Sequence, residues 1–551
     1  MSRWLSCLTA LLVALPLSAQ EIVRNASFEI ADDDGRPEAW TGVVWGGADT
    51  EPSVCTVVAR DDAPEGRYVA QTRPTAPICA AWAQQLDNLE PGRWYEASVA
   101  LKCEDLVGHG CHLNLEYWRG EIGYGCVDAE HLVGTHDWTR QTVRFLAPGP
   151  DYWMKLSLFQ IGGPGTVWFD DVTVRPIDPP DPDLSQRRVL EQPFWGMFTC
   201  FARYLHEYGE LMRDLGVHWQ RQGLSSTAPE QQQVAERLGM SFQTCIDGMP
   251  LATDPQDPCF PTTDTEAYLD FLNPFLEAAG PSIKCWEFFN EPNTHLGWSL
   301  PGYANLITRV GPAIKARHPE ALIATGGFAL PGVGYAEACL KRDPDRVIDL
   351  VLLHPYAVDE ALDATLVGMA EAAARAGRPD VAVAINETGF ATWDPATGCE
   401  SYEMFVPEDV QAQHVVKVHI QALAHRLSFV TYLAFNDITE PSDHARNMGL
   451  LRVDGSPKPS FSAYAYMTST IGDRKVADWS YGADGTRVYR FEGARPLWVA
   501  WNALRESELV LDVGEQTVMP RNMYGAGLCA LPQTGKLSLS VGTEPIYITA
   551  P

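Results

Sequence analysis

The chain is poor in basic residues, and this shortage restricts the partners that it can bind. It contains 41 Lys and Arg residues but 71 Asp and Glu residues, so its formal net charge is −30. Such a charge repels the phosphates of nucleic acids and the head groups of anionic membranes. The composition therefore argues against a nucleic-acid-binding protein and favours a neutral or cationic partner.

The sequence also lacks a long apolar run. A membrane-spanning helix needs roughly 20 apolar residues, and no segment after residue 19 provides them. Residues 1–19 contain one arginine, an apolar run at Leu8–Leu17 and the small-residue ending Leu17-Ser18-Ala19. This pattern predicts a secretory signal peptide cleaved before Gln20, and hence a secreted protein, extracellular or periplasmic. The alternative, an amino-terminal membrane anchor, is disfavoured because the apolar run is too short. The sequence does not define an oligomeric state.

No Cys-x-x-Cys pair is present, which removes the usual signature of a cysteine-based zinc site. Once Cys7 leaves with the signal peptide, twelve cysteines remain, an even count compatible with disulfides in an oxidising compartment. Buried free thiols are expected in the central strands, at Cys200, Cys245 and Cys285. We expect one or two disulfide bridges among the five cysteines nearest the amino terminus: Cys55, Cys79, Cys103, Cys111 and Cys126.

The pattern of apolar residues changes along the chain and predicts a multidomain protein. Residues 20–176 alternate apolar and polar positions in short runs, which predicts a β-sandwich. A linker is expected at 177–187, which is rich in Pro and Asp. Residues 188–472 alternate strands with amphipathic helical runs, which predicts a (β/α)8 TIM barrel. Residues 473–551 return to strand alternation and predict a small carboxyl-terminal β-sandwich.

Two apolar runs of the predicted barrel end abruptly in polar and acidic residues. Trp286–Phe289 leads into Asn290-Glu291-Pro292, and Val381–Ile385 leads into Asn386-Glu387-Thr388-Gly389. A barrel of this kind repeats roughly every 31 residues, so the 96 residues between the two glutamates span three units. We therefore expect the two carboxyl groups to face each other across the barrel mouth. Such a pair can cleave a glycosidic bond without a metal ion.

These two segments resemble the acid/base and nucleophile signatures of clan A glycoside hydrolases. The resemblance covers about residues 190–470, and the layout is similar to families 39, 5 and 51. It implies a retaining enzyme on a (β/α)8 barrel, with Glu291 as the acid/base after strand four and Glu387 as the nucleophile after strand seven. It implies no cofactor for catalysis.

The same resemblance implies supporting roles for neighbouring residues. His354-Pro355-Tyr356 resembles the His-x-Tyr element that positions the nucleophile, with Tyr356 as the leading hydrogen-bond donor to Glu387. Arg221 is similar to the arginine beneath the nucleophile, and Asn290 to the asparagine that bonds the sugar 2-hydroxyl. Four residues just past predicted strand ends are expected to contact the substrate: His295, Trp298, Trp393 and Asp437.

The segments Asn25–Glu29 and Val167–Val172 resemble the first and last strands of carbohydrate-binding jelly rolls of families 4, 9 and 22. This resemblance implies a structural calcium ion in the amino-terminal module, with Glu29 and Asp171 as candidate ligands. The alternative is a purely structural jelly roll that supports the barrel. Five aromatic residues could stack on sugar rings: Trp45, Trp82, Tyr117, Trp118 and Tyr124.

Each assignment has a simpler alternative. The two glutamates could be solvated loop acids, His354 a core histidine and Arg221 part of a structural ion pair; Glu287 fits a structural salt bridge better than a catalytic role. The expected function is a secreted retaining glycoside hydrolase that cleaves β-type bonds of a poly- or oligosaccharide. Two other functions stay open: a non-catalytic carbohydrate-binding protein on a barrel scaffold, and a transglycosylase that uses the same site.

Overall fold

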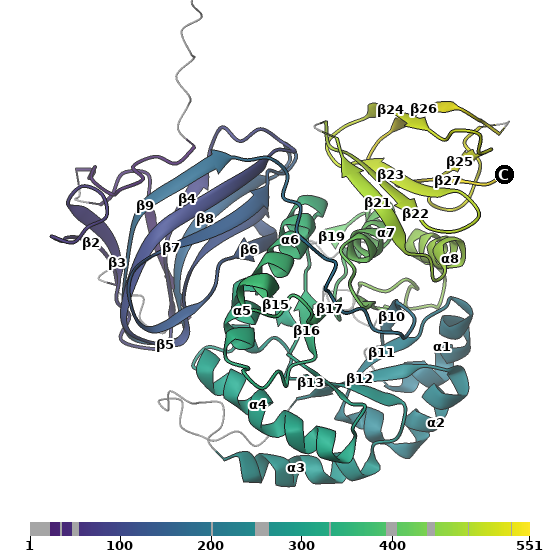
Figure 1. Cartoon of the computed structure of the whole chain (residues 1–551), viewed down its shortest axis with the longest axis horizontal. Helices are drawn as coiled ribbons and strands as arrows, with labels where there is room; N and C mark the ends of the chain where they lie inside the picture. Colours follow the sequence, from purple (N-terminus) through teal and green to yellow (C-terminus); the bar gives the residue numbers. More distant parts are fainter. Residues whose placement is uncertain are drawn as a thin grey trace, which may run out of the picture.

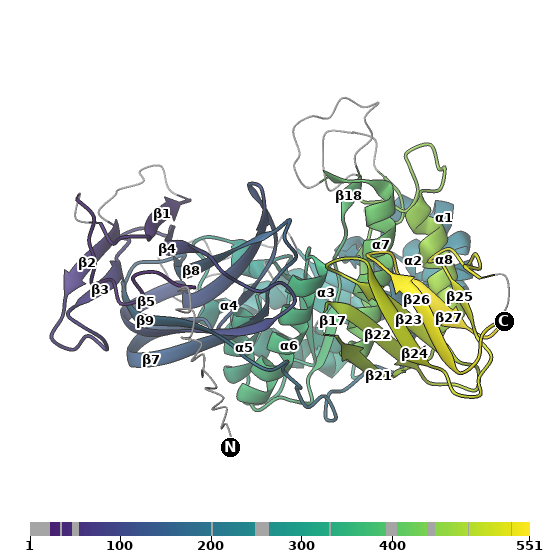
Figure 2. The same ribbon diagram turned by 90° about the horizontal axis from the view of Figure 1, so that it is seen from above.

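The computed structural model describes residues 22–33, 36–46, 54–199, 202–247, 264–329, 332–392, 405–437, 447–482, 484–529 and 532–551. The predicted signal peptide lies outside these residues. The described chain forms an amino-terminal β-sandwich, a central barrel and a carboxyl-terminal β-sandwich (Figures 1 and 2). The predicted fold class is therefore confirmed. No helix in the described part of the chain is both long and apolar enough to cross a membrane.

One strand organises the amino-terminal sandwich. The 26 residues of β5 run through both layers: the first half pairs with β7 and β9, and the second half with β6 and β8. Apolar residues of both halves, such as Leu101 and Leu113, are fully buried between the layers. The strands are β1 (Thr41–Trp45), β2 (Cys55–Ala59), β3 (Tyr68–Thr72), β4 (Cys79–Leu86), β5 (Trp94–Arg119), β6 (Ile122–Asp128), β7 (Leu132–Leu146), β8 (Trp153–Ile161) and β9 (Thr166–Pro176).

Eight parallel strands close the central barrel, because β14 pairs with both β13 and β16 and β20 pairs with both β10 and β17. The short β15 pairs with β16 beside β14. The strands are β10 (Trp195–Phe198), β11 (Trp219–Gly223), β12 (Ser241–Ile246), β13 (Ile283–Phe288), β14 (Leu322–Ala324), β15 (Phe328–Ala329), β16 (Leu350–His354), β17 (Ala382–Ile385) and β20 (Val430–Leu433).

Alternation along these strands separates the barrel interior from its outer surface. Trp219, Cys285 and Leu350 belong to one fully buried cluster inside the barrel. Side chains two residues further along a strand share a face, so Arg221 and Glu287 also point inward, nearer the carboxyl ends of the strands. Polar side chains therefore replace apolar ones at the end of the barrel where such folds carry their active sites.

Helices cover the outside of the barrel, and both sandwiches pack on this helical layer. The amino-terminal sandwich lies beside α5 and α6, and the carboxyl-terminal one lies over α7 and α8 (Figure 1). The helices are α1 (Ala202–Asp214), α2 (Pro229–Leu238), α3 (Thr265–Ala278), α4 (Leu300–Arg317), α5 (Val333–Lys341), α6 (Asp359–Arg375), α7 (Glu408–Ala424) and α8 (Pro459–Ile471), with 3-10 turns η2 (Leu224–Thr227) and η3 (Pro292–Thr294). A two-stranded sheet, β18 (Ala391–Thr392) and β19 (Phe405–Val406), precedes α7.

The carboxyl-terminal sandwich consists of a five-stranded and a two-stranded sheet that share a small apolar core. Arg487 docks it on the barrel, because its guanidinium lies 2.9 Å from Asp359 and 2.9 Å from Asp363 of α6. The strands are β21 (Val476–Tyr481), β22 (Thr486–Phe491), β23 (Leu497–Asn502), β24 (Ser507–Asp512), β25 (Met519–Arg521), β26 (Lys536–Val541) and β27 (Ile546–Thr549).

The expected disulfide bridges of the amino-terminal sandwich are not formed. All five cysteines named above are free thiols, so that prediction is wrong. Their sulfur atoms meet backbone groups instead: Cys55 Sγ donates to the carbonyl of Ala81, and Cys103 Sγ to that of Gly134. In the barrel, Cys245 and Cys285 are buried free thiols, as expected, and Cys200 lies outside the described residues.

Candidate active site

Glu291 leaves the end of β13 in a strained backbone conformation. Phe289 and Glu291 both adopt left-handed angles, with φ of 66° and 49°, which side-chain-bearing residues rarely adopt. Such strain persists where the surrounding structure enforces it, and it gathers at functional sites. The amide of Glu291 donates to the carbonyl of Gly327 at 3.1 Å, and a hydrogen bond of 3.0 Å joins its Oε1 to His354 Nδ1. The side chain keeps 27% of its surface exposed.

Glu387 follows β17, and two donors hold its carboxylate. Tyr356 donates its hydroxyl to Oε1, and Arg221 Nη1 donates to Oε2 at 2.5 Å. Burial alone would raise the pKa of Glu387, but attraction to His354 and Arg221 and the Tyr356 hydrogen bond outweigh it. The pKa of Glu387 is therefore lowered below its usual value, and the carboxylate stays ionised. This is the state that a nucleophile requires.

Arg221 connects the side chains of Glu387, Glu287 and Asn290 beneath the candidate site. Its guanidinium makes two 2.8 Å bonds to the carboxylate of Glu287, and its Nη2 also donates to Asn290 Oδ1 at 2.8 Å. Burial works against the charge, but Glu287 and Glu387 together raise the pKa of Arg221 well above its usual value. Glu287 is fully buried in this pairing, which confirms its prediction as a structural acid.

The two candidate catalytic carboxylates lie close together, with His354 between them. One oxygen of Glu291, one oxygen of Glu387 and one ring nitrogen of His354 lie within 4.8 Å of one another. This group could hold a metal ion by distance alone, but the Arg221 cation already neutralises Glu387. The arrangement suits a reaction in which one carboxyl transfers a proton while the other, ionised, meets a positive centre.

The close packing around His354 depends on residues that the sequence analysis did not single out. Gly327 follows β14, and a Cβ atom there would lie 1.9 Å from His354 Nε2 and 2.7 Å from Asn386 Oδ1. Only glycine leaves room for both side chains. The paired glycines of Thr325-Gly326-Gly327 at a strand end were the available signal, because glycine at such a place indicates close approach by another group.

Two of the predicted substrate contacts, His295 and Trp298, follow β13 and make contacts that are mainly structural. The ring of His295 stacks on Trp298 at 4.6 Å, and His295 Nε2 donates to the carbonyl of Asn290 at 3.1 Å. Trp298 is only 6% exposed and packs edge-on against Phe289. These contacts support the turn that carries Glu291. Trp393, another predicted contact, lies outside the described residues.

Asp437 follows β20 and is paired with a buried lysine. Lys458 Nζ lies 2.8 Å from both of its carboxylate oxygens, and the amide of Gly449 donates to Oδ1 at 2.8 Å. Burial raises the pKa of Asp437 despite this pairing. The carboxylate is 7% exposed, so its present partners are protein groups.

The sandwich itself reaches the turn after β13 through the middle of β5. His109 Nε2 donates to the carbonyl of His295 at 2.8 Å, and its Nδ1 lies 3.3 Å from the hydroxyl of Tyr335 on α5. His109 is completely buried. No feature of the sequence predicted this contact, because 186 residues separate its two partners.

The two predicted calcium ligands each meet protein groups. Glu29 Oε1 accepts the amides of Arg67 and Tyr68 at 2.6 Å, and Asp171 accepts a hydrogen bond from the guanidinium of Arg140. Calcium at this place stays a prediction. Of the aromatic residues expected to stack on sugars, Trp82, Tyr117 and Tyr124 are buried in the core, so that prediction is wrong for them because their rings face inward. Trp45 is 41% exposed, and Trp118 stacks on Trp153.

Comparison with known proteins agrees with this architecture. No family model and no curated protein sequence matches the chain. Among solved structures, a family 39 glycoside hydrolase from the gut symbiont Bacteroides cellulosilyticus WH2 is similar over 82% of this chain and 98% of that chain, with 16% identity and a TM-score of 0.52. This likeness shows a shared fold.

Two further structures are similar at lower scores. A family 51 α-L-arabinofuranosidase from Bifidobacterium longum has 13% identity and a TM-score of 0.41, over 62% of this chain and 88% of that chain. The CBM22-1 and GH10 modules of a Clostridium thermocellum endo-1,4-β-D-xylanase, complexed with xylohexaose, have 12% identity and a TM-score of 0.35. The likeness covers 81% of this chain and 97% of that chain.

Proposed function

We propose that the chain is a secreted retaining glycoside hydrolase that cleaves β-type bonds of a poly- or oligosaccharide. The observation that carries this proposal is the separation of at most 4.8 Å between an oxygen of Glu291 and an oxygen of Glu387. Retaining enzymes place their two carboxyl groups about 5–5.5 Å apart, whereas inverting enzymes leave about 6.5–9.5 Å for a water molecule. The observed spacing supports the retaining geometry over the inverting one.

Glu291 and Glu387 would share the reaction in two steps. In the first, Glu291 gives its proton to the leaving glycosidic oxygen while the Glu387 carboxylate attacks the anomeric carbon and forms an ester. In the second, Glu291 takes a proton from water, the resulting hydroxide attacks the same carbon, and Glu387 leaves as a carboxylate. Two inversions retain the configuration at that carbon.

The neighbouring residues would hold these two groups in their working states. Tyr356 and Arg221 keep Glu387 ionised and aimed, because both donate to its oxygens. His354 fixes Glu291 through the bond at Oε1. Arg221 also orients the side chain of Asn290, whose amide nitrogen is then free to donate to a substrate hydroxyl.

Glu387→Gln tests the proposal directly. The substitution keeps the shape of the side chain but removes the nucleophilic charge, so hydrolysis of aryl β-glycosides and polysaccharides should fall by more than about a thousandfold with the melting temperature nearly unchanged. Glu230→Gln, an exposed acid of α2, is the matched control and should keep full activity.

Three outcomes separate the alternatives. Full activity of Glu387→Gln would refute the nucleophile. A wild-type protein that binds oligosaccharides but cleaves none would identify a carbohydrate-binding scaffold. Products longer than the substrate would identify a transglycosylase, in which a sugar replaces water in the second step.

A further inference from the structure

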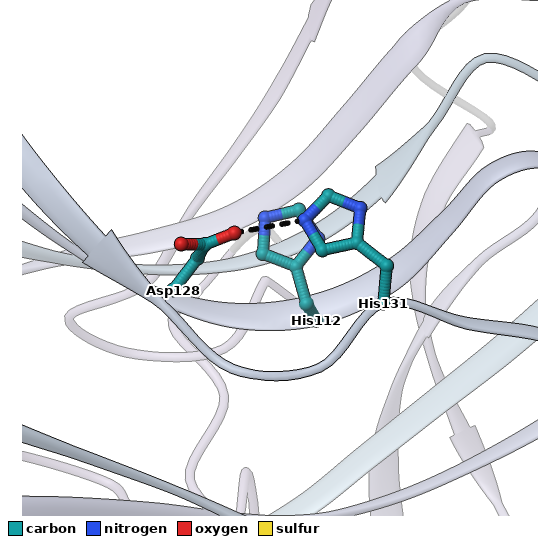
Figure 3. A group of neighbouring side chains, drawn as sticks. All are labelled: His112, Asp128 and His131. Carbon is teal, nitrogen blue, oxygen red and sulfur yellow. Dashed lines mark hydrogen bonds and ion pairs between the residues drawn. The ribbon is translucent and has the colours of Figure 1, made fainter. Parts of the chain in front are cut away.

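A second cluster of metal-ligand side chains lies far along the chain from the candidate active site, in the sandwich. His112 belongs to β5, Asp128 ends β6 and His131 follows three residues later. One ligand atom from each lies within 4.8 Å of the other two, and the residues are 3%, 5% and 4% exposed. The two imidazole rings stack at 3.8 Å, and their edges face the carboxylate (Figure 3).

Both ring nitrogens of His131 face oxygen atoms that accept hydrogen bonds, so the ring needs either a second proton or a bound cation. Its Nδ1 lies 3.0 Å from the carbonyl oxygen of His109, which can only accept, so Nδ1 carries a hydrogen. A neutral imidazole has no second N–H group, and its Nε2 therefore presents a lone pair. That nitrogen lies 3.0 Å from Asp128 Oδ2, another acceptor. Two lone pairs face each other in a buried place, which is costly unless a positive centre lies between them.

Two neighbouring buried side chains, His112 and Asn114, also have polar atoms without a hydrogen-bond partner among the described residues. His112 Nδ1 has no hydrogen-bond partner among the described residues, although the ring is buried. Asn114 lies on the same face of β5, directly across from Asp128, and its buried Oδ1 also lacks a partner in the described structure.

We propose that His112, Asp128 and His131 bind a divalent transition-metal ion, for which zinc is the best match. Imidazole nitrogens favour zinc and its neighbours over calcium or magnesium, which prefer oxygen ligands alone. A ligand histidine that donates its other N–H to a backbone carbonyl is the usual arrangement at such sites. Asn114 Oδ1 or water would complete the four ligands of zinc.

The ion would fasten the sandwich to the barrel. The second oxygen of Asp128, Oδ1, accepts the amide of Val333 at the start of α5, at 2.8 Å. The amide of His131 donates to the carbonyl of Gly334 on the same helix. A metal that fixes Asp128 and His131 therefore fixes the position of α5 relative to β6. This role is structural and independent of the proposed hydrolysis.

The test is metal analysis of the full-length protein after expression with added zinc. Wild-type protein should hold one equivalent of zinc, and removal by a chelator should lower its melting temperature by several degrees, reversed by zinc alone. His112→Gln and Asp128→Asn should each reduce the zinc content at least tenfold. His136→Gln is the matched control, because His136 lies in the same sandwich outside the cluster and its Nε2 donates to the carbonyl of Val133.

X-ray absorption of the zinc-loaded wild type tests the site without any variant, in case the cluster variants do not fold. It should show two imidazole ligands, whereas a metal held by Glu291, His354 and Glu387 would show one. Zinc content below a tenth of an equivalent in the wild type, a single imidazole, or metal lost in Glu387→Gln but kept in His112→Gln would overturn the proposal.

Discussion

In the proposed mechanism, the hydroxyl of Tyr356 controls the pH range over which Glu387 can act as a nucleophile. Burial, first of all, and the charge of Glu387 raise the pKa of Tyr356 well above its usual value, so its phenol stays protonated and donates to Oε1. Tyr356→Phe removes this donor, while its ring can keep its apolar contacts beside Met448. A hydrogen bond to a charged group contributes about 1.5–3 kcal/mol. Its loss should raise the pKa of Glu387 by roughly 1–2 units, since one unit corresponds to about 1.4 kcal/mol.

The sign of the effect follows from the required charge state. Glu387 must be ionised, so activity is lost as the pH falls through its pKa. A higher pKa moves the acidic limb of the kcat/KM profile to higher pH by roughly 1–2 units, and kcat at the optimum should fall about 10- to 100-fold.

The measurement is the pH dependence of hydrolysis of an aryl glycoside, with thermal unfolding as a check. Tyr464→Phe is the matched control, because that hydroxyl is buried in α8 without a hydrogen-bond partner in the described residues. Tyr464→Phe should change neither the acidic limb of the kcat/KM profile nor kcat. An unchanged acidic limb in Tyr356→Phe would show that the hydroxyl does not hold Glu387 ionised, and the reasoning would fail.

Two further substitutions test the packing around the site. Gly327→Ala should lower kcat at least tenfold, because the added Cβ would lie 1.9 Å from His354 Nε2, whereas Gly223→Ala, at another strand end with nothing within 4 Å, should leave kcat unchanged; equal effects would contradict the steric argument. Lys458→Met should lower the free energy of unfolding in urea by about 3–5 kcal/mol, because it leaves Asp437 buried without its cation. A loss below about 1 kcal/mol would mean that Asp437 does not depend on this pair.

The sequence predicted the parts of the site that local pattern controls. An apolar strand that ends in a glutamate is visible without coordinates, which is why Glu291 and Glu387 were identified and their strands placed within a few residues. The sequence analysis gave Arg221 and Glu287 each a possible structural ion pair, but it did not predict that they pair with each other. Period-two alternation likewise located both sandwiches.

The sequence did not predict contacts that depend on distant segments. The burial of Tyr117 follows from the way β5 crosses both layers of the sandwich, and alternation alone does not say which face is covered. The cluster of His112 with Asp128 and His131 depends on the register between β5 and β6, which sequence spacing does not reveal. The expected bridges failed because the sequence does not define the distance and orientation that a disulfide needs, even where two thiols, those of Cys103 and Cys111, lie near each other.

The hydrogen bond from His109 to His295 has a consequence for how this architecture can be dissected. Accessory modules are commonly regarded as units that can be trimmed or exchanged while the catalytic core works alone. Here the barrel would lose, on such trimming, the buried histidine that secures the turn carrying Glu291. A truncated protein that begins after the interdomain segment would therefore lack the hydrogen bond that holds this turn. A foreign module could replace the sandwich only if it placed an imidazole where His109 lies, within hydrogen-bond distance of the His295 carbonyl.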